Sequence, residues 1–242
     1  MAAAQQRRNP ACDLHVRGQN RLLTMAAEAG HAVKGLERVT LKQKAPLQKQ
    51  DVAITHAFFP LCGVGSLVTN VEGGGALEVG TMGNEGMAGI PLLLGADRSH
   101  TDSFVQIEGD FMRMTREALE RELRSNSPFA EISRRYVQAF FVQAAQSAAC
   151  LRFHQIEQRL CRWILESHDR VPDDTVPLTQ EFLAMMLGVQ RPGVTLAAAQ
   201  LQKAGYITYH RGVIEVIDRK GLEASSCDCY GIVRKEYERL LC

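Results

Sequence analysis

Short apolar runs separated by glycine-bearing turns fill the first half of the chain, from Val39 to about Arg116. Alternating apolar and polar positions over such short runs are typical of half-buried strands, and the regular spacing of the turns favours a barrel or a two-layered roll. We expect Glu72–Gly75 to be a hairpin tip whose glycines supply positive φ angles, rather than a phosphate cradle. The runs expected to be strands are VTLKQ, ITHAFFP, GSLVTNV, ALEVGTM, SFVQI and FMRM.

After these strands, apolar residues recur with the spacing of a helix instead of alternating with polar ones. Ser127 followed by Pro128 is typical of a helix start, and no proline or glycine interrupts the pattern up to about His168. A heptad stripe on this helix consists of Val137, Phe141, Ala144, Ala148 and Leu151. Because a lone helix would expose that stripe to water, we expect a second copy of the chain to cover it in a symmetric dimer. The alternative is packing on the chain's own strands, which we expect at the helix start for Phe129, Ile132, Tyr136 and Phe140.

Two shorter helical patterns joined by a glycine turn follow, from Leu178 to Leu201. Thr179 is a good N-cap for the first helix, Gly188 provides the turn, and Gln190-Arg191-Pro192 opens the second helix. Positions five, nine and fifteen of the DNA-binding helix-turn-helix motif are occupied by Ala184, Gly188 and Val194. Small, flexible and β-branched residues suit these positions because the two helices cross at close range. The alternative is an αα-hairpin in another kind of helical protein.

The flanking segments extend this picture. Val171–Asp174 breaks the long helix and is the expected domain hinge. Two β-rich stretches around a His-Arg-Gly turn, within Gly205–Ile217, predict a two-stranded wing. Arg21–His31 and Leu222–Leu241 are expected to be helices. Their expected buried side chains are Leu22, Leu23 and Met25 in the first and Ile232, Tyr237 and Leu240 in the last.

An α+β protein of three parts is therefore expected. Residues 1–126 would form a jelly-roll-like N-terminal β-roll, residues 127–170 a long dimerisation helix, and residues 171–242 a C-terminal winged helix-turn-helix domain.

Composition adds limits to this architecture. With 242 residues, 45% hydrophobic and 23% charged, the chain can bury a full core. A net charge of +1 means that any nucleic-acid site must be a local patch. No run approaches the length of a membrane span, and the start MAAAQQRRNP lacks the apolar region of a secretory leader, so we expect a cytoplasmic protein. The seven scattered cysteines fit reduced thiols better than a disulfide framework.

The order of these elements, with the stretches LTQEFLAMMLGVQRPGVT and ALEVGTMGNEGMAGIPLLLGADRS, resembles the Crp–Fnr family of bacterial transcription regulators. The resemblance covers about residues 20 to 220. It implies an effector-sensing roll of the cyclic-nucleotide-binding type, a dimerising helix and a winged helix. It also implies a homodimer that binds palindromic operators in double-stranded DNA. RNA polymerase is a further candidate partner, and no membrane is expected as one. The alternative is a cyclic-nucleotide-binding signalling module without specific DNA recognition.

The same resemblance implies that Arg191 reads guanine from the start of the second helix. The family's glutamate and second arginine correspond to Pro192 and Leu196 here, whose side chains make no hydrogen bonds to bases. We therefore expect an operator unlike the family's best-known one, read by Gln190, Arg191 and Thr195. Phosphate contacts, or ordinary solvated charge, are expected for Lys203, His210 and Arg211.

In the nucleotide-binding members the roll carries a phosphate cassette, a G-E-x-(G/A) sequence followed by an arginine and a serine or threonine. The corresponding residues here are Gly83, Glu85, Gly86, Arg98 and Ser99. The resemblance implies that Glu85 would hold a ribose hydroxyl and Arg98 a cyclic phosphate. Because Asn84 separates the glycine from the glutamate, the altered spacing favours a vestigial pocket and leaves the effector unknown.

The family's redox members bind an iron–sulfur cluster through four cysteines. Only Cys12 and Cys62 precede the long helix here, so we expect no such cluster. Cys227 and Cys229 are the one close pair. With no second pair or nearby histidine in the sequence, we expect a solvated loop or helix cap there, and no metal.

The remaining candidate residues do not indicate catalysis or haem binding. Cys150 and Cys161 are eleven apart on the expected helix and would be small core residues on one face. His154 and His168 are expected to be packed or solvated rather than haem ligands. The chain has no paired carboxylates, Ser-His-Asp order or P-loop, so we do not expect an enzyme.

Overall fold

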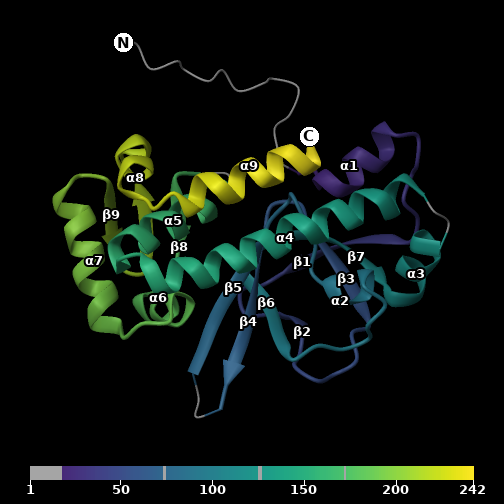
Figure 1. Cartoon of the computed structure of the whole chain (residues 1–242), viewed down its shortest axis with the longest axis horizontal. Helices are drawn as coiled ribbons and strands as arrows, with labels where there is room; N and C mark the ends of the chain where they lie inside the picture. Colours follow the sequence, from purple (N-terminus) through teal and green to yellow (C-terminus); the bar gives the residue numbers. More distant parts are fainter. Residues whose placement is uncertain (1–17, 73–74, 125–126, 172) are drawn as a thin grey trace.

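In the computed structural model, which describes residues 18–72, 75–124, 127–171 and 173–242, a β-roll lies against a long helix and a C-terminal helical region (Figure 1). The elements in chain order are α1 (Arg21–Glu28), β1 (Leu36–Leu41), β2 (Pro46–Gln48), β3 (His56–Pro60), β4 (Val64–Val71), β5 (Gly75–Met82), α2 (Ile90–Leu93), β6 (Thr101–Ile107), β7 (Gly109–Thr115), α3 (Arg116–Arg124), α4 (Pro128–Phe153), α5 (Ile156–His168), β8 (Thr175–Pro177), α6 (Gln180–Leu187), α7 (Arg191–Lys203), β9 (Ile207–His210), β10 (Val213–Val216), α8 (Arg219–Ser225) and α9 (Cys229–Leu241). The predicted α+β class, with an N-terminal roll and a C-terminal helix-turn-helix, is confirmed.

The roll consists of two antiparallel sheets, with strand orders β1-β7-β3 and β2-β6-β4-β5. Each of the six predicted runs contributes a strand, and the short β2 is an addition. β4 and β5 form the predicted hairpin, in which Val71 pairs with Gly75. Gly73 and Gly74 at its tip lie outside the described residues.

The start of α4 closes the roll, as predicted. Ser127 caps the helix by accepting a hydrogen bond from the backbone N–H of Ala130 at 3.2 Å. The predicted core-facing side chains of α4 are all buried: Phe129, Ile132, Tyr136 and Phe140. The Tyr136 hydroxyl also donates to the Met87 carbonyl of the roll at 2.8 Å, so this helix end is anchored by both packing and a buried hydrogen bond.

The prediction of one continuous helix up to His168 is wrong. The helix ends at Phe153, and a second helix begins at Ile156, giving α4 and α5. His154 and Gln155 have extended backbone angles. Gln155 and Gln158 then form a capping box, in which each side chain bonds the other's backbone N–H. Two polar side chains thus begin a new helix without proline or glycine, which is why a search for helix breakers misses the site.

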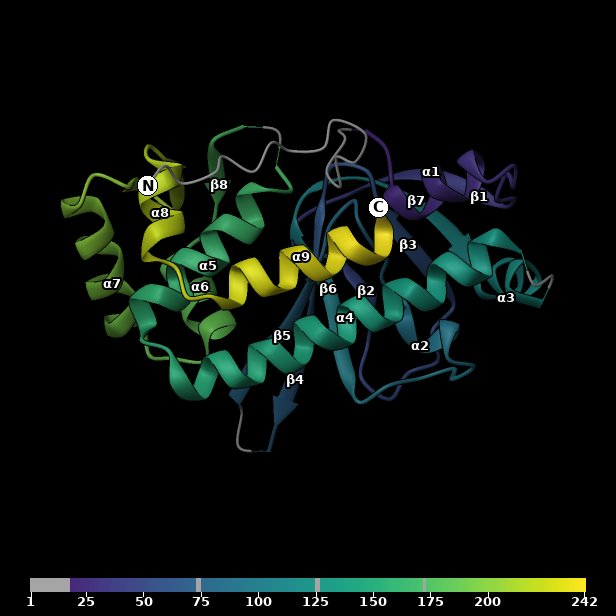
Figure 2. The same ribbon diagram turned by 45° about the horizontal axis from the view of Figure 1, so that its top comes forward.

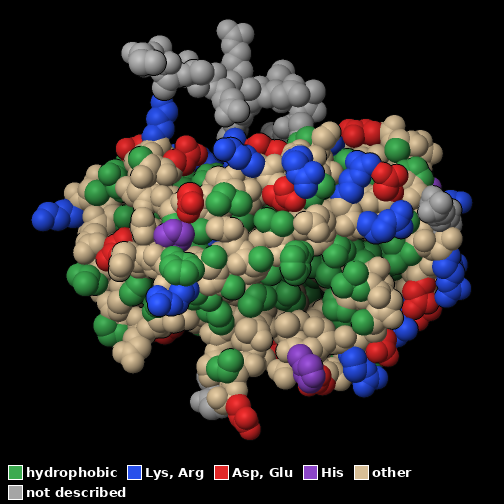
Figure 3. Space-filling view, viewed as in Figure 1, with side chains coloured by type: hydrophobic (Ala, Val, Ile, Leu, Met, Phe, Trp, Pro, Cys, Tyr) green, Lys and Arg blue, Asp and Glu red, His purple; other side chains and the backbone are tan. Residues whose placement is uncertain are grey.

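The predicted heptad stripe lies entirely on α4 and is left uncovered. Ala148 is exposed, Phe141 is 67% exposed, and the other members are half-buried. Hydrophobic side chains gather along the middle of the face that carries α4 (Figure 3). An apolar stripe of this kind marks a contact surface more often than a solvated one.

The C-terminal segment forms two helices rather than one, and α9 runs alongside α4 (Figure 2). Tyr237 is buried, as predicted, with its hydroxyl 2.9 Å from the Gln143 amide on α4. Ile232 was expected to face inward but is 40% exposed, because α9 turns its other side toward α4. In α1, Leu22 is buried and Leu23 and Met25 are partly buried, as expected.

Among the described residues, no single helix has the length and apolar character needed to cross a membrane. Only α6 and α7 taken together meet that test, and they are bent by 106° from each other.

The helix-turn-helix region packs directly on the roll. One hydrophobic cluster contains Val64, Val68 and Ile107 of the roll together with Phe182 and Leu183 of α6. The rings of Phe104 and Phe182 meet edge-on at 6.1 Å. In this arrangement the two regions therefore share one apolar core.

Candidate nucleic-acid interface

The helix-turn-helix has the local geometry that the sequence predicts. The Thr179 hydroxyl accepts the Phe182 N–H at 3.2 Å and so caps α6. Gly188 ends that helix with φ 59°, in the left-handed region, and its N–H points back to the last turn. The next helix, α7, begins at Arg191 with Pro192 in its first turn.

The positive φ of Gly188 favours glycine at the turn, and the turn also lies close to the roll. A Cβ at Gly188 would lie 2.7 Å from Leu77 Cδ1 on β5. Ala184 and Val194, the other two motif positions, are buried. The buried side of α7 consists of Val194, Ala197, Ala198 and Leu201. This turn thus joins α6 to α7 and lies beside Leu77 of β5.

The outer side of α7 is exposed, and its first turn carries the predicted base-reading residues. Gln190 is the N-cap and Arg191 is the first helical residue. The Thr195 hydroxyl lies one turn later, 2.8 Å from Gln180 Oε1 of α6. Leu196, 61% exposed, lies beside it and offers apolar contact only.

Sequence reasoning did not pair the start of α6 with the base-reading residues. Glu181 Oε1 is 2.7 Å from Arg191 Nη1, and both side chains are more than half exposed. Because water screens an ion pair this exposed, the pair holds the Arg191 guanidinium near the helix end only weakly. The spacing of the helix-turn-helix motif could have predicted this contact, because it places the N-terminus of α6 beside the N-terminus of α7.

The predicted wing is present as β9 and β10. Arg211 and Gly212 connect them with φ angles of 48° and 80°, the positive pair of a type I′ hairpin turn. His210 and Arg211 are exposed at its tip. A third strand, β8, pairs with β10 and was not predicted.

Hydrogen bonds hold the wing against the helix-turn-helix. The Tyr209 hydroxyl donates to the Leu178 carbonyl at 2.8 Å, and the Tyr209 N–H donates to Gln202 Oε1 at 2.9 Å. The wing tip therefore lies near the start of α6. Lys203 is exposed at the opposite end of α7, so the predicted phosphate contacts flank the helix on two sides.

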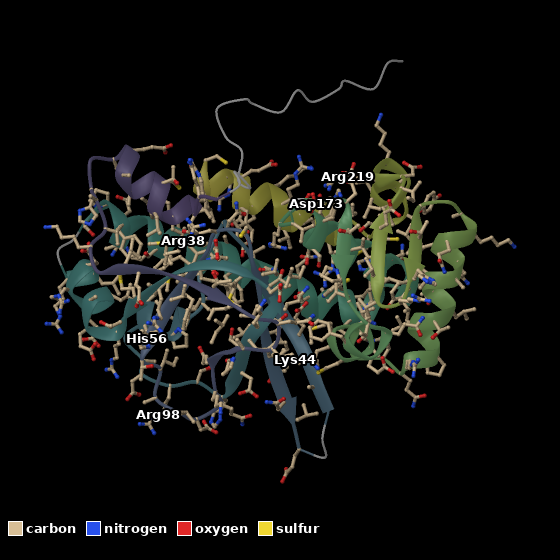
Figure 4. All side chains as sticks on the ribbon, turned by 180° about the vertical axis from the view of Figure 1, so that it is seen from behind. Arg38, Lys44, His56, Arg98, Asp173 and Arg219 are labelled. Atoms are coloured by element: carbon tan, nitrogen blue, oxygen red, sulfur yellow. The ribbon has the colours of Figure 1, made fainter. Side chains whose placement is uncertain are left out.

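The structure does not bring the predicted cassette residues of the roll together. Glu85 is 1% exposed and accepts hydrogen bonds from Arg170 Nε at 3.0 Å and Nη2 at 2.8 Å. Arg98 lies on an outer loop, at the opposite edge of the roll from α9, and contacts Asp97 (Figure 4). The Ser99 hydroxyl is 2.8 Å from that of Thr101.

Side chains of this chain fill the space that a nucleotide would need. A Cβ at Gly83 would meet Arg170 at 2.4 Å, and one at Gly86 would meet the Tyr136 ring at 2.3 Å. The cavity lined by Glu85 and Arg170 measures about 30 Å³, and a second one between β5, α4 and α5 about 10 Å³, whereas small-molecule sites span about 300–1,000 Å³. Effector binding at the predicted residues stays a prediction that this conformation does not favour.

The expectations for the cysteines need correction. Cys227 and Cys229 are buried rather than solvated, and they lie against Cys150 and His154. The missing histidine is thus supplied from 75 residues away in the chain. Cys150 is on α4 and Cys161 on α5, so they do not share a helix face.

The oxidation states of the cysteines also differ in part from expectation. The free thiols among the described residues are Cys62, Cys150, Cys161, Cys227 and Cys229, whereas Cys242 forms a disulfide. Cys12 lies outside the described residues.

A capped two-helix unit with an exposed second helix, a hairpin wing and a roll beside it have the architecture of a winged helix-turn-helix protein. Residues 158–225 match the family described as the Crp-like helix-turn-helix domain. The chain therefore carries that domain and has the fold of Crp/Fnr transcription regulators, as the sequence resemblance implied. The matched region begins inside the segment predicted as a dimerisation helix, and the domain boundaries at residues 126 and 170 stay predictions.

Solved structures of such regulators are similar in fold. FixK2 from Bradyrhizobium japonicum has a TM-score of 0.68 at 14% identity, over 79% of this chain and 98% of that chain. TTHB099, a CRP-family regulator from Thermus thermophilus, has a TM-score of 0.63 at 16% identity, over 78% and 96%. TTHA1359, a CRP/FNR-family regulator from the same organism, has a TM-score of 0.61 at 21% identity, over 78% and 98%. No curated protein matches the chain in sequence, and none of these three structures is described as an enzyme.

Proposed function

We propose that this chain is a sequence-specific transcription regulator that binds a palindromic operator as a homodimer and carries a sensory roll. The observation that carries the proposal is the exposed first turn of α7, where Gln190 and Arg191 precede a capped, tightly crossed helix pair. A helix presented in this way fits the major groove of DNA. Binding to operators would place the protein in the cytoplasm of a bacterium.

A selection from random DNA tests the proposal. A regulator should enrich one palindrome and bind it about 10³-fold or more tightly than random duplex at physiological salt. The half-sites should lie about one helical turn, or a multiple, apart. Equal binding to all duplexes, at every salt concentration, would contradict specific recognition.

Substitution Arg191→Ala should weaken operator binding by about 1–3 kcal/mol per half-site, because alanine cannot form the bidentate hydrogen bonds to guanine. The weakening should vanish on operators in which that base pair is replaced. Fluorescence anisotropy with a set of single-base operator variants measures this pattern. As the matched control, Lys203→Ala should weaken binding equally on all variants and lower the slope of the salt dependence by about one ion for each phosphate that the lysine neutralises. Uniform weakening by Arg191→Ala would show that Arg191 contacts phosphate only.

The dimer is proposed to form along the heptad stripe of α4. Phe141→Glu should raise the dimer dissociation constant by about 10²–10⁴-fold, because each copy loses the burial of one large apolar side chain, about 1.5–3 kcal/mol. Analytical ultracentrifugation measures the shift. Phe153→Glu is the control, since Phe153 is 74% exposed and lies outside the stripe. A chain that is monomeric before any substitution would refute the dimer.

Effector action is proposed as a shift between two positions of the winged helix relative to the roll. Polar contacts between the roll and α5 or the segment after it include three among the described residues. Trp163 Nε1–H donates to Glu78 at 2.7 Å, Arg170 pairs with Glu85 at 2.8 Å, and the Gln106 amide donates to the Ser167 hydroxyl at 3.3 Å. A ligand can change the balance only through different affinities for the two arrangements. Calorimetry with cyclic mononucleotides tests the predicted pocket, and absence of binding heat for all of them would remove that ligand class.

A further inference from the structure

Four side chains that offer sulfur or nitrogen donors meet where the end of α4 approaches the start of α9. They are Cys150, His154, Cys227 and Cys229. The donor atoms, three Sγ and one imidazole nitrogen, all lie within 4.8 Å of one another. The three cysteines are buried, and the histidine side chain is 24% exposed.

We propose that these four residues bind one Zn²⁺ ion. Zinc prefers a tetrahedral site of thiolates and imidazoles, with Zn–S near about 2.3 Å and Zn–N near about 2.0–2.1 Å. Those bond lengths place two tetrahedral sulfur ligands about 3.8 Å apart and a sulfur and a nitrogen about 3.6 Å apart. The chain has 3.5 Å between Cys150 Sγ and Cys227 Sγ, and 3.4 Å between Cys229 Sγ and His154 Nδ1. The donors are thus spaced almost as the ion requires.

The groups around the four residues also fit a metal site. His154 presents Nδ1 to the cluster, and its other ring nitrogen, Nε2, is 3.5 Å from Asp228 Oδ1. A carboxylate in this position orients a metal-bound histidine and makes it more basic. The Gln146 amide donates to Cys229 Sγ at 3.2 Å, a bond that is stronger to a thiolate than to a thiol.

The charge near the cluster has the sign that a three-thiolate site needs. Three thiolates and one Zn²⁺ carry a net charge of −1. Arg162 of α5 has a 10% exposed side chain and interacts electrostatically with Cys150, Cys227 and Cys229. Its Nε is buried without a hydrogen-bond partner among the described residues. A buried guanidinium is costly unless negative charge lies nearby. Glu166 supplies one carboxylate, 3.3 Å from Arg162 Nη1, and an anionic zinc centre would add a second negative group on the side of the cysteines.

A disulfide between Cys150 and Cys227 is the competing use of the closest thiol pair. It would leave Cys229 and His154, with its carboxylate partner, without a role. Zinc uses all four donors. It would join the last turn of α4, directly before the break at Gln155, to the first residue of α9. The ion would therefore fix the chain at the junction from which the winged helix extends.

The wild-type chain, purified with a non-thiol reductant, provides the first test. It should bind about one zinc ion per chain, measured by elemental analysis after dialysis. Replacement by Co²⁺ should produce the intense visible bands of tetrahedral cobalt and a thiolate-to-cobalt charge-transfer band. Failure of the reduced chain to take up either ion, or a weak octahedral cobalt spectrum, would overturn the proposal, as would a Cys150–Cys227 disulfide in metal-free protein from freshly lysed cells.

Two variants and one control identify the ligands. Cys227→Ser should lose the zinc, whereas Cys161→Ser, which removes a buried thiol outside the cluster, should retain it. Asp228→Asn is the variant that keeps the fold, because Asp228 is 74% exposed. It should weaken zinc binding by about 10- to 100-fold in a competition with a chromophoric chelator. Unchanged stoichiometry in Cys227→Ser, or unchanged affinity in Asp228→Asn, would show that the metal lies elsewhere.

Discussion

Glu85→Ala should lower the free energy of unfolding by about 3–5 kcal/mol, because it leaves the buried Arg170 guanidinium without its carboxylate. The Arg170 side chain is 6% exposed, and Glu85 accepts from two of its nitrogens. Only the bond from Nη1 to the Glu166 carbonyl, at 2.8 Å, would remain among those described for the guanidinium. Urea denaturation followed by circular dichroism at neutral pH measures the loss.

Two further variants separate the unpaired charge from loss of packing. The double variant Glu85→Leu/Arg170→Met removes both charges and should be close to wild type in stability. Glu131→Ala, which breaks the exposed ion pair with Arg135 on α4, should cost no more than about 1 kcal/mol. If Glu85→Ala lowers the free energy of unfolding as little as Glu131→Ala does, Arg170 reaches water and the Glu85–Arg170 pair does not stabilise the interior.

Stability should fall as pH rises from about 4.5 to about 7, because burial raises the pKa of Glu78 to about 7 from its ordinary 4.5. Hydrogen bonds from Ser66 and Trp163 act in the opposite direction but do not outweigh burial. The folded chain holds the proton that the unfolded chain releases. The contribution is thus fully present below pH 4.5 and is lost as the pH rises through about 7. At about 1.4 kcal/mol per pH unit over this range, it amounts to about 3.5 kcal/mol.

The hydrogen-bond geometry independently favours a protonated Glu78. Ser66 Oγ lies 2.5 Å from Glu78 Oε2 and 2.7 Å from Gln106 Oε1, yet a hydroxyl has one hydrogen for two acceptors. A proton on Glu78 resolves this, since Glu78 then donates to Ser66 and Ser66 donates to Gln106.

Glu78→Gln isolates the titration of this group. The amide keeps the hydrogen bonds of the protonated acid, so this part of the pH dependence should disappear from unfolding curves recorded between about pH 4.5 and 7.5. Glu37→Gln changes a 64% exposed carboxylate of the roll and should leave the pH profile as it is. If the profiles of Glu78→Gln and wild type coincide, Glu78 is ionised in the folded chain.

The sequence was sufficient to predict element boundaries wherever a single residue determines the local backbone conformation. Thr179, Gly188 and Pro192 bound the helix-turn-helix, and Ser127 begins α4, each through hydrogen bonds or φ angles within a few residues. The same local signals failed at Gln155. There a capping box of two glutamines, rather than a proline or glycine, ends one helix and begins the next.

The candidate interface could be predicted better than the candidate sensor site. The residues of the first turn of α7 are fixed by helix register, so Gln190 and Arg191 fall where the motif places them. Glu85 and Arg98 are thirteen residues apart and depend on how a loop closes. Arg170, from another region of the chain, takes the carboxylate that a nucleotide would need.

The sequence by itself determined the strands of the roll, the capped helix pair with its exposed arginine and the apolar stripe of α4, because periodicity and caps act over neighbouring residues. Only the tertiary structure decided which distant side chains meet: Glu85 with Arg170, Glu78 with Trp163, and Cys150 and His154 with Cys227 and Cys229. Such contacts join residues up to 85 positions apart. They depend on how the elements pack, and no local pattern encodes that packing.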